Sequence, residues 1–344
     1  MHIAVFGAGS VGCYIGGCLA HAGIKVTLIG RPRILDEIRQ HGLTVSDYLG
    51  RNHTIAPSHL NLGEQAELAA KADLVLLTVK SAATAESAQS LSKVLAPHVP
   101  IISFQNGVGN AATLAQYLTR NPCIPGMVPF NVLARGQGRF HQGTEGSLVV
   151  QAFDMPDGTE DAFQHAGLPL ALPVDIAPIQ WGKLLINLNN SVNALSGVPL
   201  KEELSQRGYR LCVAGAMKEA LSLMKQAGIT PAKATNLPPH WVPSLMSVPD
   251  WIFVRLASKM LAIDPLARSS MWEDLCRGRP TEIDWINGEV LRLGDQVREK
   301  GSVLRTPVNS ALIDLIRQAE SGGRQDWSGA ELLEILRSAA IHKA

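Results

Sequence analysis

Residues 2–12 read HIAVFGAGSVG, and this stretch decides the fold of the first half of the chain. The apolar residues at 2–6 predict a buried strand, and the glycines after them match G-x-G-x-x-G at the start of a predicted helix, 10–22. In such a strand–turn–helix unit the first glycine permits a tight turn, the second lets a pyrophosphate approach the backbone, and the third lets helix and strand pack closely. Glycines that serve only a tight turn are the alternative. We predict a dinucleotide-binding loop formed by Gly7, Ala8, Gly9, Ser10, Val11 and Gly12.

Short apolar runs and helical patterns alternate through the rest of the first half. The pattern predicts strands at 25–29, 72–79 and 101–104, and a helix at 82–95. Strands that alternate with helices form crossover units and a parallel sheet that is covered on both faces. Short β-like pieces with many glycines follow at 123–150, and they predict an antiparallel addition at the sheet edge.

Helical patterns take over after Pro178. The predicted helices span 179–195, 202–227, 250–263, 281–300 and 309–320. The proline-rich segment 237–243 is predicted as a loop, and the sequence predicts a last helix whose Ser328 and Glu331 have capping-box spacing. We therefore predict an α/β protein. An N-terminal Rossmann-type parallel-sheet domain covers 1–174, and an all-helical substrate-binding domain covers 175–344, with 321–344 as a C-terminal extension.

The composition excludes several classes of protein. The 344 residues include 31 Lys and Arg against 30 Asp and Glu, which argues against a nucleic-acid or membrane partner, because both need clustered basic charge. No run approaches the roughly 18 apolar residues of a membrane-spanning helix. The five cysteines include no C-x-x-C pair and indicate reduced thiols, so we expect a soluble cytoplasmic protein. The ten histidines show no metal-ligand spacing, and we expect no metal.

The residues after the second predicted strand bear on the cofactor. A carboxylate about 20 residues after the glycine loop would bind the ribose hydroxyls of NAD, but this sequence has Arg31 there and no acid before Asp36. An arginine offers charge and a forked donor to a 2′-phosphate, which a carboxylate would repel. We therefore predict NADPH (and NADP⁺) rather than NADH, bound by Arg31 with help from Arg33. A solvated loop arginine is the alternative.

Polar residues also follow two later strands, at the edge where open parallel sheets bind ligands. Lys80 comes just after the strand at 72–79, and Asn106, next to Gly107, comes just after the strand at 101–104. Taken alone, each is equally well explained as an ordinary strand-to-helix turn.

The first predicted helix of the second half carries Lys183 and Asn187 at positions i and i+4, so both lie on one face. If that face lines a cleft, desolvation lowers the pKa of the lysine and makes it a better proton donor near neutral pH. A lysine that reaches solvent along the helix is the other interpretation. Farther on, Glu282 and Asp284 stand at a predicted helix start, where acids are favoured by the helix dipole. Capping is the better explanation for Asp284, and for Glu282 the two interpretations stay open.

Together these motifs resemble the ketopantoate reductase (2-dehydropantoate 2-reductase) family over roughly residues 1–320. The matching elements are Gly7-Ala8-Gly9-Ser10-Val11-Gly12, Arg31, Thr78-Val79-Lys80, Gln105-Asn106-Gly107, Trp181-x-Lys183-x3-Asn187, Ser269-Ser270-Met271 and Thr281-Glu282-Ile283-Asp284. The resemblance implies NADPH-dependent reduction of ketopantoate to D-pantoate, on the route to pantothenate and coenzyme A.

The resemblance also implies roles for individual residues. Lys183 would be the general acid that protonates the substrate carbonyl oxygen, and Glu282 would anchor the terminal hydroxyl of the substrate. The remaining implied contacts to substrate or cofactor fall on Lys80, Asn106, Asn187, Ser191 and Ser270. Ser191 stands where the family often has a second asparagine, and residues 266–268 lack an amide that some members have.

Three functional hypotheses follow from these residues. The first is ketopantoate reduction, the second is the same chemistry on a different small 2-keto acid, and the third is a non-catalytic NADPH-binding protein. A helical second domain is compatible with a monomer and with a homodimer.

Overall fold

The computed structural model describes residues 1–233, 237–258, 261 and 264–342, and the chain divides into two compact units. The first unit is Met1–Ile176 and the second is Ala177–Ala344. The first contains all the described strands and the second is built from helices. No helix in the described ranges is both long and apolar enough to cross a bilayer.

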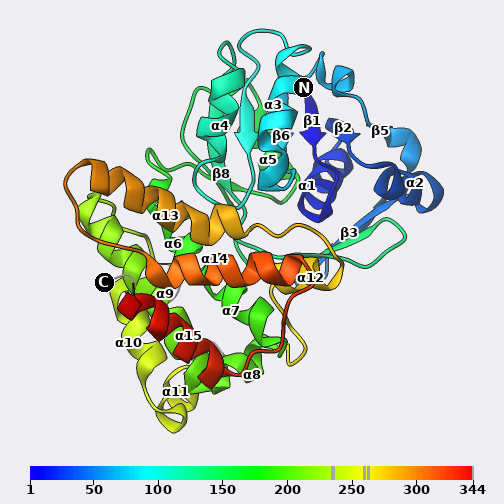
Figure 1. Ribbon diagram of the computed structural model, residues 1–344. Coiled ribbons are helices and arrows are strands. Elements are labelled where there is room, and N and C mark those ends of the chain that lie inside the picture. The colour runs from blue at the N-terminus through cyan, green and yellow to red at the C-terminus, as the bar shows by residue number, and fades with distance from the viewer. Residues whose placement is uncertain (234–236, 259–260, 262–263, 343–344) are drawn as a thin grey trace. The chain divides into compact units, whose positions relative to one another are not determined.

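The first unit is built on an eight-stranded sheet (Figure 1). From edge to edge its strands are β12 (Leu170–Ala171), β11 (Leu148–Val150), β8 (Cys123–Met127), β7 (Ile101–Ser103), β6 (Leu74–Leu77), β1 (His2–Phe6), β2 (Lys25–Ile29) and β5 (Leu60–Gly63). All pairs from β8 to β5 are parallel, which confirms the predicted parallel sheet. β11 pairs antiparallel with β8 at the predicted edge addition. The chain runs outward from β1 through β2 to β5 and then returns to β6 beside β1, so the strand order reverses between β1 and β6.

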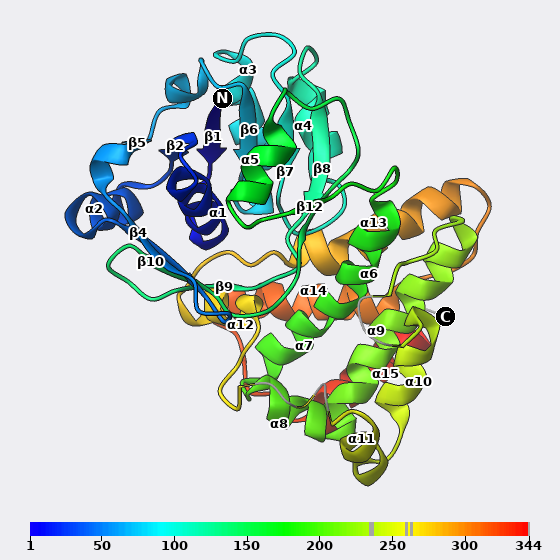
Figure 2. The same cartoon turned by 180° about the vertical axis from the view of Figure 1, so that it is seen from behind.

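Helices cover both faces of this sheet (Figure 2) because successive strand residues point to opposite sides. On β1, Ile3 and Val5 join one hydrophobic core and Ala4 joins the other. The first core packs against α1 (Ser10–His21), α2 (Pro32–His41) and α5 (Thr159–His165), and the second against α3 (Thr84–Ser92) and α4 (Asn110–Tyr117). The helix predicted at 82–95 corresponds to α3 and is shorter than predicted. A 3₁₀ turn, η3 (Ser81–Ala83), takes the place of its first residues. Two further 3₁₀ turns are η1 (Pro57–His59) and η2 (Ala66–Ala69).

A second sheet of four strands was not predicted. Its order is β4 (Asn52–Ile55), β3 (Leu43–Asp47), β10 (Arg139–Gln142) and β9 (Val132–Ala134). β9 and β10 thus leave the main sheet, which corrects the expectation that the whole segment 123–150 adds to its edge. The reason is tertiary, since β10 pairs in parallel with β3, a strand far away in the sequence.

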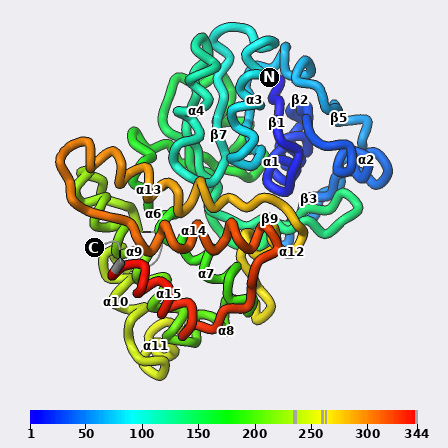
Figure 3. Tube along the Cα trace, viewed as in Figure 1, coloured from blue at the N-terminus to red at the C-terminus, as the bar shows by residue number. Residues whose placement is uncertain are grey.

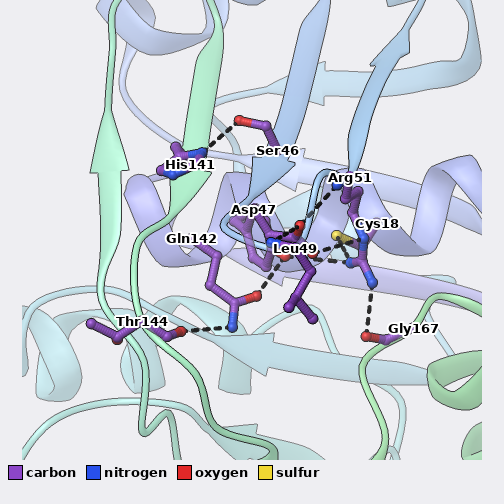
Figure 4. Close-up of polar contacts among 10 residues, drawn as sticks. Cys18, Ser46, Asp47, Leu49, Arg51, His141, Gln142, Thr144 and Gly167 are labelled. Atoms are coloured by element: carbon purple, nitrogen blue, oxygen red, sulfur yellow. Dashed lines mark hydrogen bonds and ion pairs between the residues drawn. The ribbon is translucent and has the colours of Figure 1, made fainter.

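Figure 4 shows the polar contacts around this small sheet. The Arg51 guanidinium donates to Cys18 Sγ on α1 at 3.1 Å and to Gly167 O at 3.0 Å. Gln142 on β10 accepts a hydrogen bond from the Tyr14 hydroxyl on α1 at 2.6 Å. The small sheet is therefore fastened to the helix whose first turn follows the glycine loop.

The second unit is helical, and Figure 3 traces its chain. Its α-helices are α6 (Ala177–Asn187), α7 (Asn189–Ser196), α8 (Leu200–Ser205), α9 (Arg207–Gln226), α10 (Val242–Ser247), α11 (Asp250–Leu256), α12 (Ser270–Cys276), α13 (Ile283–Glu299), α14 (Pro307–Glu320) and α15 (Gly329–His342). The long α9 packs against α10, α13, α14 and α15. The predicted capping box of the last helix is confirmed, since Ser328 N donates to Glu331 Oε2 at 3.0 Å and Glu331 N donates to Ser328 Oγ at 3.3 Å.

Several predicted helix boundaries in this unit are wrong. The helix at 179–195 is two helices that meet at Leu188, and the helix at 202–227 is interrupted at Gln206, which has extended torsion angles. The predicted loop 237–243 contains a 3₁₀ turn, η4 (Pro239–Trp241), and the start of α10. Proline has no backbone N–H, but the N–H groups of a helix's first turn have no partner within the helix. Pro243, in the first turn of α10, is therefore compatible with that helix. The helix at 250–263 ends earlier, with α11, and 259–260 and 262–263 lie outside the described residues.

Candidate active site

The glycine loop joins β1 to α1, and its geometry explains two of its three glycines. Gly7 has φ +117°, and a Cβ there would lie 2.5 Å from Val79 N. A Cβ at Gly12 would lie 2.3 Å from Gly7 O. Both positions therefore require glycine for the fold itself, independently of any ligand.

Gly9 differs from these two glycines. It is exposed, and a Cβ there would find its nearest heavy atom, Gly7 O, 4.0 Å away. Gly9 is also the N-cap of α1, and no side chain caps that helix. The first N–H groups of a helix carry no intrahelical partner and form a binding site for anions. The loop therefore fits the pyrophosphate of a dinucleotide, and its residues are Gly7, Ala8, Gly9, Ser10, Val11 and Gly12.

Arg31 follows β2 at the same end of the sheet. A Cβ at the preceding residue, Gly30, would lie 2.5 Å from the Cβ of Ala8, so this segment packs directly on the glycine loop. The Arg31 side chain is exposed and, within the described part of the chain, forms no ion pair. Arg33, in contrast, is 3.1 Å from Glu37. Of the two arginines, Arg31 is the one that fits a phosphate ligand.

The end of β6 is also joined to the glycine loop. Thr78 Oγ1 donates to Gly7 O at 2.7 Å, and the exposed Lys80 follows two residues later. Because the strand order reverses between β1 and β6, Lys80 lies at the switch point where sheets of this kind bind ligands.

Gln105 and Asn106, after β7, have different environments. Gln105 is buried, and its amide donates to Val79 O at 3.0 Å and to Thr84 Oγ1 at 2.8 Å. It therefore ties two turns together. Asn106 is half-buried, and its backbone oxygen accepts from Asn110 Nδ2 at 2.6 Å.

In the second unit, Lys183 and Asn187 lie one turn apart on α6, and both are half-buried. Burial lowers the pKa of the Lys183 ammonium to about 8, and the negative charge of Glu282 opposes this by raising it. The structure thus brings Lys183 into electrostatic contact with Glu282, which stands about a hundred residues later in the sequence.

Glu282 and Asp284 take different roles at the start of α13. Glu282 is the N-cap residue, but its side chain makes no capping hydrogen bond. Asp284 lies in the first turn and pairs with Arg317 at 2.7 Å. The structural interpretation therefore accounts for Asp284, whereas the capping interpretation does not account for the Glu282 side chain.

The two serines expected at the substrate also differ. Ser270 is exposed at the first position of α12, directly after Ser269, whose hydroxyl accepts from Trp272 N at 3.1 Å as the helix cap. Ser191 is fully buried on α7, and its hydroxyl donates to Leu188 O at 3.1 Å. No group of three His, Cys, Asp or Glu side chains in the described residues is arranged to hold a metal ion.

Comparison with known proteins identifies the family. The model for "Ketopantoate reductase PanE/ApbA" matches residues 3–155, and the model for its C-terminal domain matches residues 175–320. The chain belongs to the ketopantoate reductase family. It is therefore an oxidoreductase of that family, as the resemblance of its motifs predicted.

Individual members of the ketopantoate reductase family are distant in sequence and close in fold. The 2-dehydropantoate 2-reductase of Pyrococcus horikoshii is 26% identical over 334 residues, which cover 94% of this chain and 99% of that protein. A PanE/ApbA family ketopantoate reductase from Ralstonia eutropha JMP134 has a TM-score of 0.79 at 28% identity, over 94% of this chain and 99% of that one. A D-mandelate dehydrogenase, solved with NADH and anilino(oxo)acetate, has a TM-score of 0.73 at 23% identity, again over 94% and 99%.

The sequence analysis missed one residue of this ketopantoate reductase fold that supports the candidate site. Asn110, the first residue of α4, is buried and donates to Asn106 O and, at 3.2 Å, to Ser81 Oγ. Its Oδ1 accepts from Thr84 Oγ1 at 2.9 Å. It thereby holds the Asn106 turn against the turn after Lys80. The only sequence signal was an asparagine after two glycines, which is also typical of an ordinary loop.

Proposed function

We propose that this chain reduces 2-dehydropantoate (ketopantoate) to D-pantoate with NADPH, a step on the route to pantothenate and coenzyme A. The observation that carries the proposal is the relation of Lys183 to Glu282 in the helical unit. A half-buried ammonium whose pKa burial lowers to about 8 interacts there with a carboxylate from another helix. Perturbed, partnered ionisable groups of this kind are characteristic of reaction centres.

The first unit supports the choice of cofactor. The uncapped N-terminus of α1 and the open face of Gly9 fit a pyrophosphate, and Arg31, which is exposed and has no ion pair with the residues that the structure describes, fits a 2′-phosphate. Lys80 and Asn106 follow the ends of β6 and β7, and we assign them contacts to the bound cofactor or substrate. When bound, the nicotinamide supplies the hydride for the substrate carbonyl carbon.

Lys183 supplies the proton in this proposal. As negative charge develops on the carbonyl oxygen, the Lys183 Nζ donates its proton to that oxygen and leaves an alcohol. With a pKa near 8, the ammonium is still mostly protonated at pH 7 and gives up its proton more readily than an ordinary lysine. The charge of Glu282 keeps the pKa from falling further, so that the acid form persists.

Glu282 also provides selectivity in this proposal. Its side chain does not cap α13, and we assign its carboxylate to accept a hydrogen bond from the terminal hydroxyl of ketopantoate. Asn187, on the same helix as Lys183, and the exposed Ser270 are assigned to substrate orientation. Ser191 is not assigned to substrate, because its hydroxyl is buried and bonded to Leu188 O.

A second candidate is the same reduction on another 2-keto acid. The fold similarity to D-mandelate dehydrogenase favours it, since that enzyme is named for a 2-hydroxy acid without a terminal hydroxyl. The test is an NADPH-oxidation assay on a panel of 2-keto acids that includes ketopantoate and its analogue without the 4-hydroxyl.

Three outcomes of this panel are informative. We expect loss of the hydroxyl to lower kcat/KM by at least about 100-fold, because the half-buried Glu282 carboxylate then loses its hydrogen bond to the substrate. Equal rates on the two compounds would instead support the second candidate. No turnover on any 2-keto acid would favour a non-catalytic NADPH-binding protein.

A further inference from the structure

Five polar side chains lie buried near the ends of β6 and β7 in the first unit. Each is at most 7% exposed, and we call them the polar network: Ser81, Thr84, Ser103, Gln105 and Asn110. The proposed function assigns none of them a contact to cofactor or substrate. Buried polar groups are costly unless each is paired, so five of them at one place need an explanation.

Gln105 forms one end of the polar network. Its Nε2 donates to Val79 O at 3.0 Å and to Thr84 Oγ1 at 2.8 Å, and its Oε1 accepts from Ser103 Oγ at 2.8 Å. A backbone carbonyl oxygen can only accept, so the nitrogen of the Gln105 amide has to face Val79. Both hydrogens of that nitrogen are then used, and the orientation of the amide is fixed.

Asn110 forms the other end of the polar network. The Thr84 hydroxyl accepts from Gln105, and its own hydrogen goes to Asn110 Oδ1 at 2.9 Å. The Asn110 Nδ2 in turn donates to Asn106 O at 2.6 Å and to Ser81 Oγ at 3.2 Å. The Ser81 hydroxyl donates to Asn106 O at 3.1 Å. Asn106 O therefore accepts two hydrogen bonds from the polar network.

The polar network has one consistent arrangement of hydrogen bonds. Val79 O and Asn106 O, at its two ends, are both acceptors, and each side-chain hydrogen between them is used once. Turning either amide by 180° would place its oxygen against a backbone carbonyl oxygen. Fully satisfied networks of this kind rigidify the groups that they join. The polar network contains no ionisable side chain, so its arrangement does not depend on pH.

The polar network is attached to the backbone at the candidate ligand contacts. It binds Val79 O directly before Lys80, and it includes the Ser81 side chain directly after Lys80. Its third attachment is the backbone oxygen of Asn106 itself. Lys80 and Asn106 are the residues that the proposed function assigns to the bound cofactor or substrate. The polar network therefore holds the backbone from which both of these side chains extend.

We propose that Thr84 and Asn110 are positioning residues, which hold the Lys80 and Asn106 turns in the geometry that the ligands require. Both act through the backbone of the two turns and touch neither cofactor nor substrate. The order of the turns stands on the hydrogen bonds of the polar network, and only its effect on the ligands rests on the proposed function. Groups that are held in place before a ligand arrives lose less entropy when it binds.

Nuclear magnetic relaxation of the ligand-free full chain tests the order of the turns. Thr84→Val stays close to the shape of the side chain and removes the hydroxyl that links Gln105 to Asn110. We expect backbone order parameters of about 0.85 at Ser81 and Gly107 in the wild type, and a loss at both positions in Thr84→Val. Thr84→Ser keeps the hydroxyl and should keep the wild-type values. Equal order parameters in Thr84→Val and the wild type would overturn the proposal.

Thr27→Val is the matched control. Thr27 is fully buried on β2 in the same unit, and its hydroxyl is bonded to His2 Nε2 at 2.7 Å and to Asn61 Nδ2 at 3.2 Å. Both partners lie outside the polar network. A lower Tm is expected in both valine variants, because each loses buried hydrogen bonds. Only Thr84→Val should lower the order parameters of the two turns, and a loss of the same size in Thr27→Val would contradict a specific role of Thr84.

Steady-state kinetics test the effect on the ligands. At a temperature well below the Tm of every variant, Thr84→Val should lower kcat/KM for the keto acid about tenfold, the usual effect of one hydrogen bond. Thr84→Ser and Thr27→Val should stay within about twofold of the wild type. A merely structural role would lower Tm in both valine variants and leave kcat/KM unchanged in both. That result would refute the positioning role.

A double-mutant cycle tests whether the effect passes through Asn106. In the Asn106→Ala variant the positioned side chain is absent, so Thr84→Val should cost less in kcat/KM there than in the wild type. A cost as large as in the wild type would show that Thr84 does not act through Asn106.

Ser81→Ala replaces Thr84→Val if that variant does not fold. It removes one of the two donors to Asn106 O and should lower kcat/KM about threefold, and an unchanged value would again count against the proposal. Absence of turnover by the wild type on all keto acids would refute the proposed function. The relaxation measurement would then still decide whether the polar network orders the two turns.

Discussion

The two units of this chain provide binding groups in different ways. In the first unit the candidate cofactor site consists mainly of backbone at the ends of β1 and β6, where Gly7 and Thr78 meet. In the second unit the candidate chemistry depends on side chains from separate helices, with Lys183 on α6 and Glu282 at the start of α13. A backbone site depends on space and on unpaired N–H groups, whereas a side-chain site depends on desolvation and on the charge of a neighbour. Substitutions in the two units should therefore impair function for different physical reasons.

The largest effect is expected in the helical unit. Lys183→Ala removes the proton donor and should lower kcat by about 1000-fold, because general acid catalysis is worth about 10²–10⁴ in rate. The Kd for NADPH, measured by fluorescence titration, should stay near the wild-type value, since the predicted cofactor residues lie in the first unit. Lys183→Arg is the matched control. It keeps the charge but gives up its proton poorly, so it should rescue little activity. A kcat within about tenfold of the wild type for Lys183→Ala would exclude Lys183 as the acid.

The next effect concerns the first unit. Arg31→Asp replaces an exposed cation by an anion and should reduce the preference for NADPH over NADH, as a ratio of kcat/KM, by about 100-fold. Arg33→Asp is the control, because Arg33 already pairs with Glu37 and should change the ratio much less. If both variants keep the wild-type ratio, the cofactor preference is set elsewhere.

The sequence predicted the parts of the fold that are determined by local pattern. β1, the glycine loop, α1 and β2 were predicted to within a residue of their observed ends, because strand, turn and helix signals follow each other directly there. The four-stranded sheet was not predicted, since β3 finds its partner β10 far along the chain. The breaks at Leu188 and Gln206 were also missed, because neither residue is a glycine or a proline.

The same distinction holds for the candidate site. The roles of Gly7 and Gly12 in the turn are readable from their spacing, and the structure adds the atoms that a Cβ would meet. For Lys183, helical spacing was equally consistent with a side chain that lines a cleft and with one that reaches solvent. Its burial and its relation to Glu282 depend on packing between helices that are distant in the sequence, which no local pattern carries.

A smaller effect is expected in the glycine loop, where two substitutions should distinguish residues needed for NADPH binding from residues needed for stability. Gly9→Ala adds a methyl group that comes no closer than 4.0 Å to Gly7 O, so Tm should stay near the wild-type value while NADPH affinity falls about tenfold. Gly12→Ala places its Cβ 2.3 Å from Gly7 O and should instead destabilise the protein by about 1–3 kcal/mol. Thermal unfolding and NADPH titration of both variants check this. If Gly9→Ala bound NADPH normally, the loop would be a structural turn only.

The smallest effect is a shift in a pH profile, and it tests whether Lys183 and Glu282 act together. Lys183 donates only while protonated, and burial lowers its pKa to about 8, so kcat should fall as the pH rises through that value. The charge of Glu282 raises this pKa, and Glu282→Gln should therefore move the fall in kcat to lower pH. Asp284→Asn is the matched control, because Asp284 pairs with Arg317 and is not among the charges that act on Lys183. An unchanged profile in Glu282→Gln would mean that the proton donor is not the lysine beside Glu282. A shift of the same size in Asp284→Asn would mean that general surface charge, rather than this carboxylate, sets the profile.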